Sequence, residues 1–212
     1  MTERIIVAIT GATGAIFGVR ALERLREFDL ETHVIISPWG AKTIEHETGR
    51  SVKEVRALAD VSHRPQEQGA TISSGSFLTL GMLVAPCSVK TLAAISSGFA
   101  EDLVARAADV VLKEQRKLVL MVRESPLNAI HLENMLRLSR AGATMLPPMP
   151  AFYNQPGSID DVVDHIVTRT LDQFGLHSDA TKRWDGKLEH SSGRTSADHD
   201  AADENHKEAP WP

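Results

Sequence analysis

The stretch RIIVAITGATGAIFG, residues 4–18, decides how we expect the chain to fold. It opens with a β-branched apolar run at 4–10, which has the length and composition of a buried strand. A turn containing Gly11 and Gly14 follows, and the apolar spacing of residues 18–28 is typical of an amphipathic helix. A strand, a glycine-rich turn and a helix in this order predict the first βα unit of a parallel sheet.

The same alternation continues along the chain. Four more short apolar runs predict strands, and these are 32–37, 81–86, 117–122 and 143–148. Five more stretches show helical spacing of apolar residues, namely 41–48, 88–98, 101–115, 130–142 and 159–175. Three of these helices are expected to stop at Gly98, Gly142 and Gly175. We therefore predict an α/β fold of right-handed βαβ units, with ligands bound beyond the carboxyl ends of the strands.

Composition narrows the class of protein. The 212 residues are 42% apolar and carry a net charge of −5, which argues against the broad basic surface of a nucleic-acid-binding protein. The single cysteine, Cys87, excludes an intrachain disulfide and a cysteine-rich zinc site. The charged start of the chain is unlike a signal peptide, and no apolar run has the length of a membrane span. We expect a cytoplasmic protein that acts on small molecules and has no membrane or nucleic-acid partner.

The chain is expected to contain one domain, 1–186, and a disordered acidic tail, 187–212. The tail has few aliphatic residues to bury, and its three basic against six acidic residues account for −3 of the total −5. The body that remains has 20 basic and 22 acidic residues, so it is nearly neutral.

The ends of the predicted strands carry the residues suited to ligand binding. The first turn has the spacing GxxGxxxG, which misses the GxGxxG dinucleotide fingerprint, and Ser37 stands where a ribose-binding acid would end the second strand. Tyr153 is followed four residues later by Gly157 and so lacks the Tyr-x-x-x-Lys pair of short-chain dehydrogenases. The turn predicts a phosphoester ligand bound at the start of a helix, or else a plain tight turn. Ser88 is a natural helix N-cap that is also in position to contact a ligand.

Several cations and one phenol follow later strands. Arg123 and Glu124 end the fourth strand, Arg106 and Lys113 lie two turns apart on one helix, and Arg169 lies on the last helix. The simplest interpretation of each of these charged side chains is that it lies on the surface and is solvated by water. If they converge with Tyr153, they would instead form a strong phosphate site.

Seven blocks of sequence together resemble the UbiX/Pad flavin prenyltransferases, close to the B subunits of hydroxyarylic acid decarboxylases. The blocks are GATGAIFGVRALERL, the strand end at Ser37, DVSHRPQEQGATISSGSF, PCSVKTL, RAADVVLKEQRKLVLMVRESP, IHLENML and PPMPAFYNQP. The resemblance covers about residues 3–186. It implies a Rossmann-like three-layer α/β/α sandwich and a metal-independent reaction, in which dimethylallyl phosphate alkylates reduced FMN at N5 and C6. It also implies a homo-oligomer, typically a dodecamer with shared sites, and a UbiD-type decarboxylase that receives the prenylated FMN.

The resemblance also implies roles for residues. FMN contacts match Gly11, Ala12, Thr13, Ser37, Ser88, Val89, Lys90, Thr91 and Arg123. The prenyl phosphate matches Lys113, Tyr153 and Arg169, and Arg106 joins them as a further anion contact. Glu124 matches an acid that assists proton transfer and Glu47 another acid near the flavin, and Ser37 is counted as catalytic as well.

The chain departs from its relatives at two places, and two rival functions stay open. Thr13 replaces a common serine, and the loop HRPQEQ lacks a tryptophan that some relatives have, so an aromatic wall must come from elsewhere. The rivals are a decarboxylase subunit that acts directly on aromatic acids and a non-catalytic FMN-binding module. The sequence leaves open the choice of phosphate or pyrophosphate donor, the acid that the partner processes, the oligomeric state and the role of the tail.

Overall fold

The computed structural model describes residues 2–178, 183, 184 and 186, so the predicted tail lies outside the described residues. The chain divides into two units, Met1–Lys182 and Arg183–Pro212, and every element described below belongs to the first.

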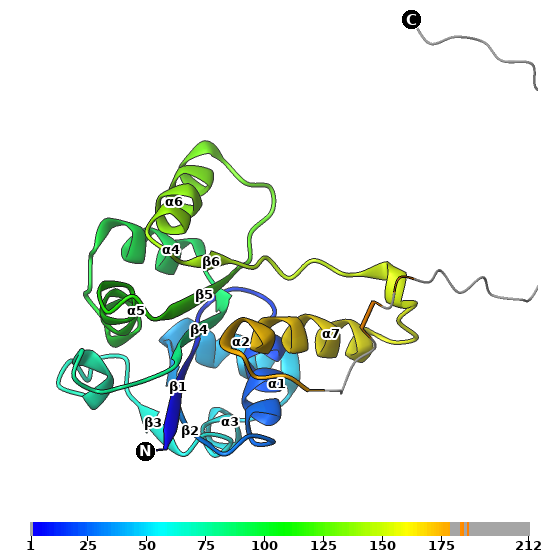
Figure 1. Cartoon of the computed structure of the whole chain (residues 1–212), viewed down its shortest axis with the longest axis horizontal. Helices are drawn as coiled ribbons and strands as arrows, with labels where there is room; N and C mark the ends of the chain where they lie inside the picture. The colour runs from blue at the N-terminus through cyan, green and yellow to red at the C-terminus, as the bar shows by residue number, and fades with distance from the viewer. Residues whose placement is uncertain (1, 179–182, 185, 187–212) are drawn as a thin grey trace, which may run out of the picture. The chain divides into compact units, whose positions relative to one another are not determined.

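The first unit is built on one six-stranded sheet with the strand order β3-β2-β1-β4-β5-β6, in which every pair of neighbours is parallel. The strands are β1 (Glu3–Ile9), β2 (Leu30–Ile36), β3 (Val61–His63), β4 (Gly81–Cys87), β5 (Lys117–Val122) and β6 (Thr144–Met145). The helices are α1 (Ala15–Leu25), α2 (Pro38–Thr48), α3 (Val52–Arg56), α4 (Val89–Ser97), α5 (Leu103–Lys113), α6 (Ala129–Arg140) and α7 (Ile159–Leu171). Figure 1 shows their arrangement.

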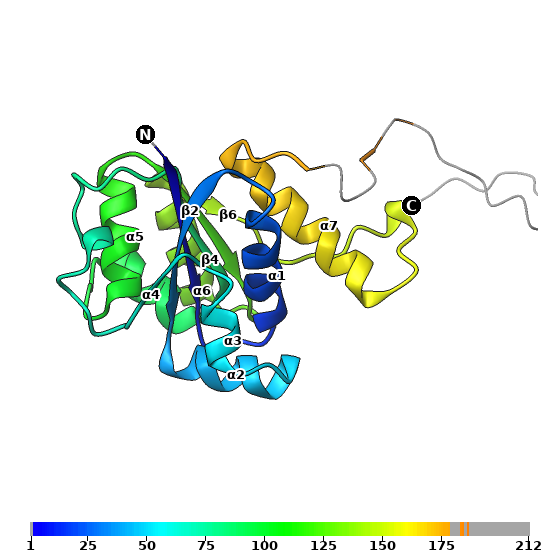
Figure 2. The same ribbon diagram turned by 90° about the horizontal axis from the view of Figure 1, so that it is seen from below.

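Helices cover both faces of the sheet, which makes three layers (Figure 2). Along β1, Ile5, Val7 and Ile9 point into a core shared with α1 and α7, whereas Ile6 and Ala8 point into a second core shared with α4 and α5. This alternation follows from the two-residue period of a strand. The expected α/β/α sandwich with a parallel sheet is confirmed.

The position of α1 depends on a glycine. A Cβ atom on Gly18 would lie 2.2 Å from the carbonyl oxygen of Ala85 on β4. Only a residue without a side chain allows this close approach, so the third glycine of GxxGxxxG serves helix-to-sheet packing.

Several predicted boundaries were wrong, each for a local reason. The strand predicted at 143–148 ends at Met145, because Pro147 and Pro148 have no N–H to donate to a neighbouring strand. The helix predicted at 18–28 starts earlier, at Ala15. Both α3 and β3 were missed, since a five-residue helix and a three-residue strand are too short to show a period.

The predicted glycine stops are confirmed. Gly98 follows α4 with φ 72°, Gly142 follows α6 with φ 103°, and Gly175 ends a 3₁₀ turn (Asp172–Phe174) after α7 with φ 75°. Among the described residues, no helix has both the length and the apolar character needed to cross a membrane.

Candidate active site

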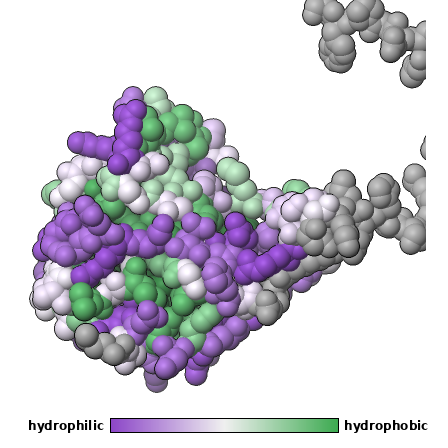
Figure 3. Space-filling model, in the orientation of Figure 1, coloured by the Kyte–Doolittle hydropathy of each residue, from purple (hydrophilic) through white to green (hydrophobic). Residues whose placement is uncertain are grey.

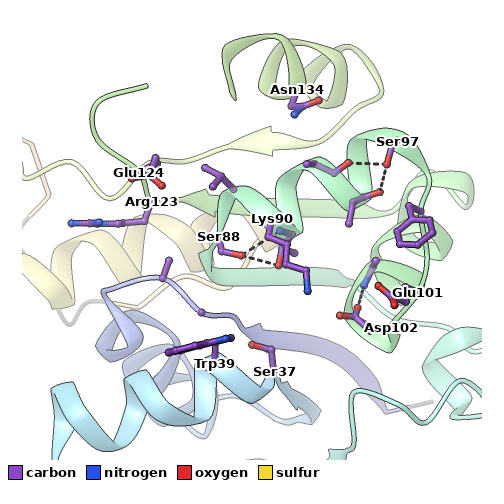
Figure 4. A pocket seen from close by; sticks show the side chains of 18 of the residues that line it. Ser37, Trp39, Ser88, Lys90, Ser97, Glu101, Asp102, Arg123, Glu124 and Asn134 are labelled. Atoms are coloured by element: carbon purple, nitrogen blue, oxygen red, sulfur yellow. Dashed lines mark hydrogen bonds between the residues drawn. The ribbon is translucent and has the colours of Figure 1, made fainter. Parts of the chain in front are cut away.

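A cavity of about 810 Å³ lies beyond the carboxyl ends of β1 and β4. The order of the strands reverses between these two, and a ligand in an open α/β sheet binds at such a reversal. Its walls come from the first turn, the starts of α2 and α4, the segment from α4 to α5, the end of β5, and α6 (Figure 4). The lining residues are Gly11, Ala12, Ser37, Pro38, Trp39, Ser88, Val89, Lys90, Thr91, Ala93, Ala94, Ser97, Phe99, Glu101, Asp102, Ala105, Arg123, Glu124 and Asn134.

Two helix N-termini meet at this cavity, and each has a serine cap. The Ser37 hydroxyl accepts a hydrogen bond from Gly40 N at 3.0 Å, and the Ser88 hydroxyl accepts one from Thr91 N at 3.2 Å. Both helix starts carry the partial positive charge of the helix dipole and N–H groups that are free for a ligand of opposite charge. The cavity is therefore suited to an anion.

Thr10 holds the two sides of the cavity together. Its hydroxyl donates to the Pro86 carbonyl at 2.8 Å and accepts from Ser88 N at 2.9 Å. Thr10 is 1% exposed, so these bonds are shielded from water and fix the end of β1 against the start of α4.

Trp39 supplies an aromatic wall that the sequence interpretation missed. Its indole is 67% exposed and faces the cavity below Ser88 (Figure 4). A Cβ atom on Gly11 would lie 2.3 Å from Cβ of Trp39, so the first glycine is needed for the close approach of loop and indole. The signal was present in the sequence, because Trp39 comes two residues after the predicted strand end at Ser37.

The last strand end contributes the neighbouring Arg123 and Glu124. Arg123 N donates to the Cys87 carbonyl at 3.1 Å, which pins the end of β5 to β4, and both side chains line the cavity. One Glu124 oxygen accepts from Ser125 N at 3.0 Å. A carboxylate and a guanidinium are thus available at the cavity edge for proton transfer and anion binding.

Cys87 lies next to these residues but has no access to a ligand. Its side chain is fully buried, and burial raises the pKa of the thiol to about 12. Because the nucleophilic form of cysteine is the thiolate, this placement argues against a catalytic role for Cys87.

Glu47 caps a helix in this structure, and its expected role as an acid near the flavin stays a prediction. Its carboxylate accepts hydrogen bonds from Gly14 N at 2.8 Å and Ala15 N at 2.9 Å, so it caps the N-terminus of α1. The N–H groups that the sequence interpretation offered to a phosphoester hold this carboxylate instead. Neither Glu47 nor Thr13 is among the lining residues, although Thr13 is exposed.

The four residues expected to hold a second phosphate do not meet within one chain. Arg106 and Lys113 lie on α5, on one side of the sheet, and Arg169 lies on α7, on the other side. Arg106 pairs with Asp109 at 2.8 Å, Lys113 pairs with Glu114, and Arg169 pairs with Asp172 at 2.9 Å. Tyr153 lies in a 3₁₀ turn (Phe152–Asn154) and is 51% exposed.

Other lining residues were not predicted. Asn134 reaches the cavity from α6, and Phe99, Glu101 and Asp102 form its edge between α4 and α5 (Figure 4). Asp102 also caps α5 by accepting from Ala105 N at 2.9 Å. Residues in the middle of a helix, such as Asn134, carry no strand-end signal. Among the described residues, no group of three or more His, Cys, Asp or Glu side chains is arranged to hold a metal ion.

Comparison with known proteins agrees with this geometry. The Flavoprotein family profile matches residues 1–171. A probable UbiX-like flavin prenyltransferase of Streptomyces sp. (strain D7) is 63% identical over 184 residues, which is 86% of this chain and 92% of that protein.

Two solved structures share the fold. The structure of AnUbiX (PadA1) in complex with FMN and dimethylallyl pyrophosphate has a TM-score of 0.87 at 52% identity, covering 88% of this chain and 100% of that one. A dodecameric FMN-dependent UbiX-like decarboxylase from Escherichia coli O157:H7 has a TM-score of 0.85 at 60% identity, covering 87% and 100%.

Proposed function

The chain belongs to the UbiX-like flavin prenyltransferases, and from this premise we propose how its residues divide the reaction between two substrates. The cavity over β1 and β4 takes reduced FMN. The cations of α5 and α7 take the phosphate of the prenyl donor, which we propose to be dimethylallyl phosphate. The single observation that carries the proposal is a cavity with two capped helix N-termini and one exposed indole.

The chemical types of the residues that line the cavity match the parts of FMN. Its phosphate finds a helix N-terminus at Ser88 to Thr91, with Arg123 at the edge for a second charge contact. A flat aromatic ring system finds the exposed face of Trp39 and the backbone of Gly11 and Ala12. Val89 and Lys90 complete this contact set.

The chemistry requires charge stabilisation more than a protein nucleophile. The flavin N5 supplies the electron pair that forms the new carbon–nitrogen bond, and the allylic C–O bond breaks with phosphate as the leaving group. Arginine and lysine side chains then stabilise the departing phosphate, so no metal is needed in this proposal. Glu124 is the group that moves a proton as the second bond forms at C6, and Ser37 lines the same cavity from the start of α2.

The phosphate site is proposed to form between subunits. Arg106 and Lys113 are separated by the sheet from Arg169, and a neighbouring chain would bring a second set within reach. The relative from Escherichia coli O157:H7 is a dodecamer. Exposed apolar side chains also gather over α6 (Figure 3), where Ile130, Leu132 and Leu136 are 66%, 52% and 51% exposed. Such a patch favours burial against another copy.

The product is proposed to leave for a partner enzyme. Prenylated FMN is a cofactor rather than an end product, so we propose a UbiD-type decarboxylase as its recipient. The cytoplasmic location expected from the charged start of the chain stays a prediction.

Anaerobic incubation with reduced FMN and dimethylallyl phosphate tests the function. Mass spectrometry of the extracted flavin is expected to show one added prenyl unit, and unchanged flavin would contradict the proposal. Loss of carboxylate from a hydroxybenzoate by this chain alone would support direct decarboxylation, whereas tight FMN binding with neither reaction would support a binding module. The variant Glu124→Gln is expected to bind FMN as the wild type does and to turn over slowly. Full activity in that variant would remove Glu124 from the mechanism.

A further inference from the structure

The segment between β6 and α7 leaves the body of the domain as an extended arm (Figure 1). It contains Pro147, Pro148 and Pro150 and ends in the 3₁₀ turn that carries Tyr153. Phe152 is 73% exposed and Tyr153 is 51% exposed, so the turn has little core of its own. A side chain outside the arm must therefore fix the direction of the phenol.

His165, in the middle of α7, makes two contacts with this turn. Asn154 Nδ2 lies 2.7 Å from His165 Nδ1, so the amide donates and the ring nitrogen accepts. The Tyr153 ring meets the imidazole edge to face, with centroids 6.0 Å apart at an angle of 90°. Edge-to-face pairs of this kind stabilise one relative orientation of two rings.

The same histidine is linked by helix geometry to the cation of α7. Arg169 follows His165 by four residues, so the two side chains lie on the same face one turn apart. The turn that carries the phenol is thus bound to the helix face that carries the guanidinium.

The base of the arm is already fixed. Gly157 N and Ser158 N both donate to Asp161 Oδ2, at 2.8 and 3.0 Å. Arg20 on α1 binds Asp160 at 2.9 Å and Asp164 at 2.5 Å, which holds the first half of α7 against the body. The contact with His165 is a further attachment of the arm to α7, and it lies nearer to the phenol.

We propose that His165 is a positioning residue for prenyl transfer, which holds Tyr153 and Arg169 as one unit so that both meet the donor phosphate. The proposal rests on the proposed function, because it takes Tyr153 and Arg169 as phosphate contacts. In this role His165 touches neither substrate; it sets the orientation of the phenol through Asn154 and through the ring contact.

Kinetics of His165→Leu and His165→Gln test the role. His165→Leu is expected to raise KM for dimethylallyl phosphate about tenfold, the size expected for loss of one hydrogen bond with its packing, and to leave kcat and FMN affinity nearly unchanged. His165→Gln keeps an acceptor for Asn154 and is expected to recover part of the loss. The exposed His46 gives the control His46→Leu, which removes an imidazole elsewhere.

A double-mutant cycle separates positioning from a general structural effect. If His165 acts through the turn, Asn154→Ala and His165→Leu together are expected to raise KM no more than His165→Leu alone. A parallel fall in melting temperature, FMN affinity and donor affinity would overturn the proposal, as would an unchanged KM.

The single tyrosine of the chain allows a direct readout. Protein labelled with fluorotyrosine has one fluorine resonance, at Tyr153, which is expected to shift when dimethylallyl phosphate is added to the FMN-bound wild type. In His165→Leu the resonance is expected to move before any addition and to need about tenfold more donor for the same response. No response in the wild type would contradict Tyr153 as a phosphate contact. An identical response in wild type and variant would contradict the positioning role alone.

Discussion

The FMN cavity and the cations proposed for the donor phosphate are built in opposite ways. The cavity proposed for FMN is fixed by buried and partly buried hydrogen bonds at the sheet edge, through Thr10 and the capped helices at Ser37 and Ser88. Lys113 and Arg169 are exposed and Arg106 is half-buried, and Arg106 and Arg169 each pair with an acid three residues later on the same chain. The cavity proposed for FMN is thus held in place by contacts within one chain, whereas the cations proposed for the donor phosphate are held only by local ion pairs.

The difference has an energetic reason. A largely exposed ion pair contributes only about 0–1 kcal/mol, so a phosphate can displace Asp109 from Arg106, whose side chains are 41% and 36% exposed, at small cost. Breaking the bonds of Thr10 would strand buried polar groups, at about 1–3 kcal/mol each. In the proposed function, the rigid half would therefore set where FMN binds, and the adaptable half would respond to the leaving group.

Removing a donor-side cation is expected to give the largest effect. Arg169→Ala and Lys113→Ala should each lower kcat/KM by about 100- to 1,000-fold, as for loss of one group that stabilises developing charge, while FMN affinity stays within about twofold. Steady-state kinetics and FMN titration measure both quantities. A matching loss of FMN affinity would break the division between the two halves.

Co-expression of these two inactive chains tests whether the donor half is shared. If Lys113 and Arg169 of one site come from different subunits, mixed oligomers should regain about a quarter of wild-type activity. Mixed oligomers without activity would place both residues of a site in one subunit.

Adding a side chain where the rigid half is tightly packed is expected to have the next largest effect. Gly18→Ala sets a Cβ atom against the Ala85 carbonyl and should lower the free energy of unfolding by about 1–3 kcal/mol. Gly69→Ala is the control, because a Cβ atom there meets nothing within 4 Å. Denaturant unfolding compares them, and equal stability of the two variants would show that the sheet edge is softer than its contacts indicate.

The cap at Ser88 separates stability from binding. Ser88→Ala should cost about 1 kcal/mol of stability and also weaken FMN binding, because it frays the helix start that lines the cavity. Ser51→Ala removes the cap of α3 at a similar cost in stability, with FMN affinity unchanged. Equal FMN affinity in the two variants would contradict a phosphate at the start of α4.

The smallest effect is expected from pH, in a region outside both halves. His33 Nδ1 and His63 Nε2 lie 2.9 Å apart at the β2–β3 edge, with Glu31, Arg4, Asp60 and Glu67 as the charged groups around them. Burial lowers the pKa of both imidazoles, and the neighbouring His33 lowers that of His63 further.

The unfolded chain therefore binds more protons than the folded one below its ordinary histidine pKa of about 6.5. Stability is full above that pH and is expected to fall by about 1 kcal/mol per pH unit just below it. Denaturant unfolding at a series of pH values above and below about 6.5 measures how the free energy of unfolding depends on pH. The variant His63→Phe is expected to reduce this dependence. A steeper slope in that variant would contradict the sign.

The sequence predicts the rigid half better than the adaptable one, for physical reasons. Gly11, Ser37 and Ser88 act through local geometry, which a turn or cap signal reports directly. Asn134 reaches the cavity only through tertiary packing, and Glu47 takes N–H groups that the local sequence pattern assigns to a ligand. The roles of Tyr153, Arg106, Lys113 and Arg169 come from family resemblance, because no local pattern tells a phosphate contact from a solvated charge.

The burial of the Cys87 thiol matters when the protein is exposed to oxygen. Reduced flavins react with oxygen, and the peroxide that results attacks thiolates in preference to thiols. With the pKa of its thiol at about 12 and no exposed surface, Cys87 stays protonated and shielded, directly before Ser88 in the wall of the cavity. The one sulfhydryl of the chain is thereby insulated from the oxidant that its own substrate can generate.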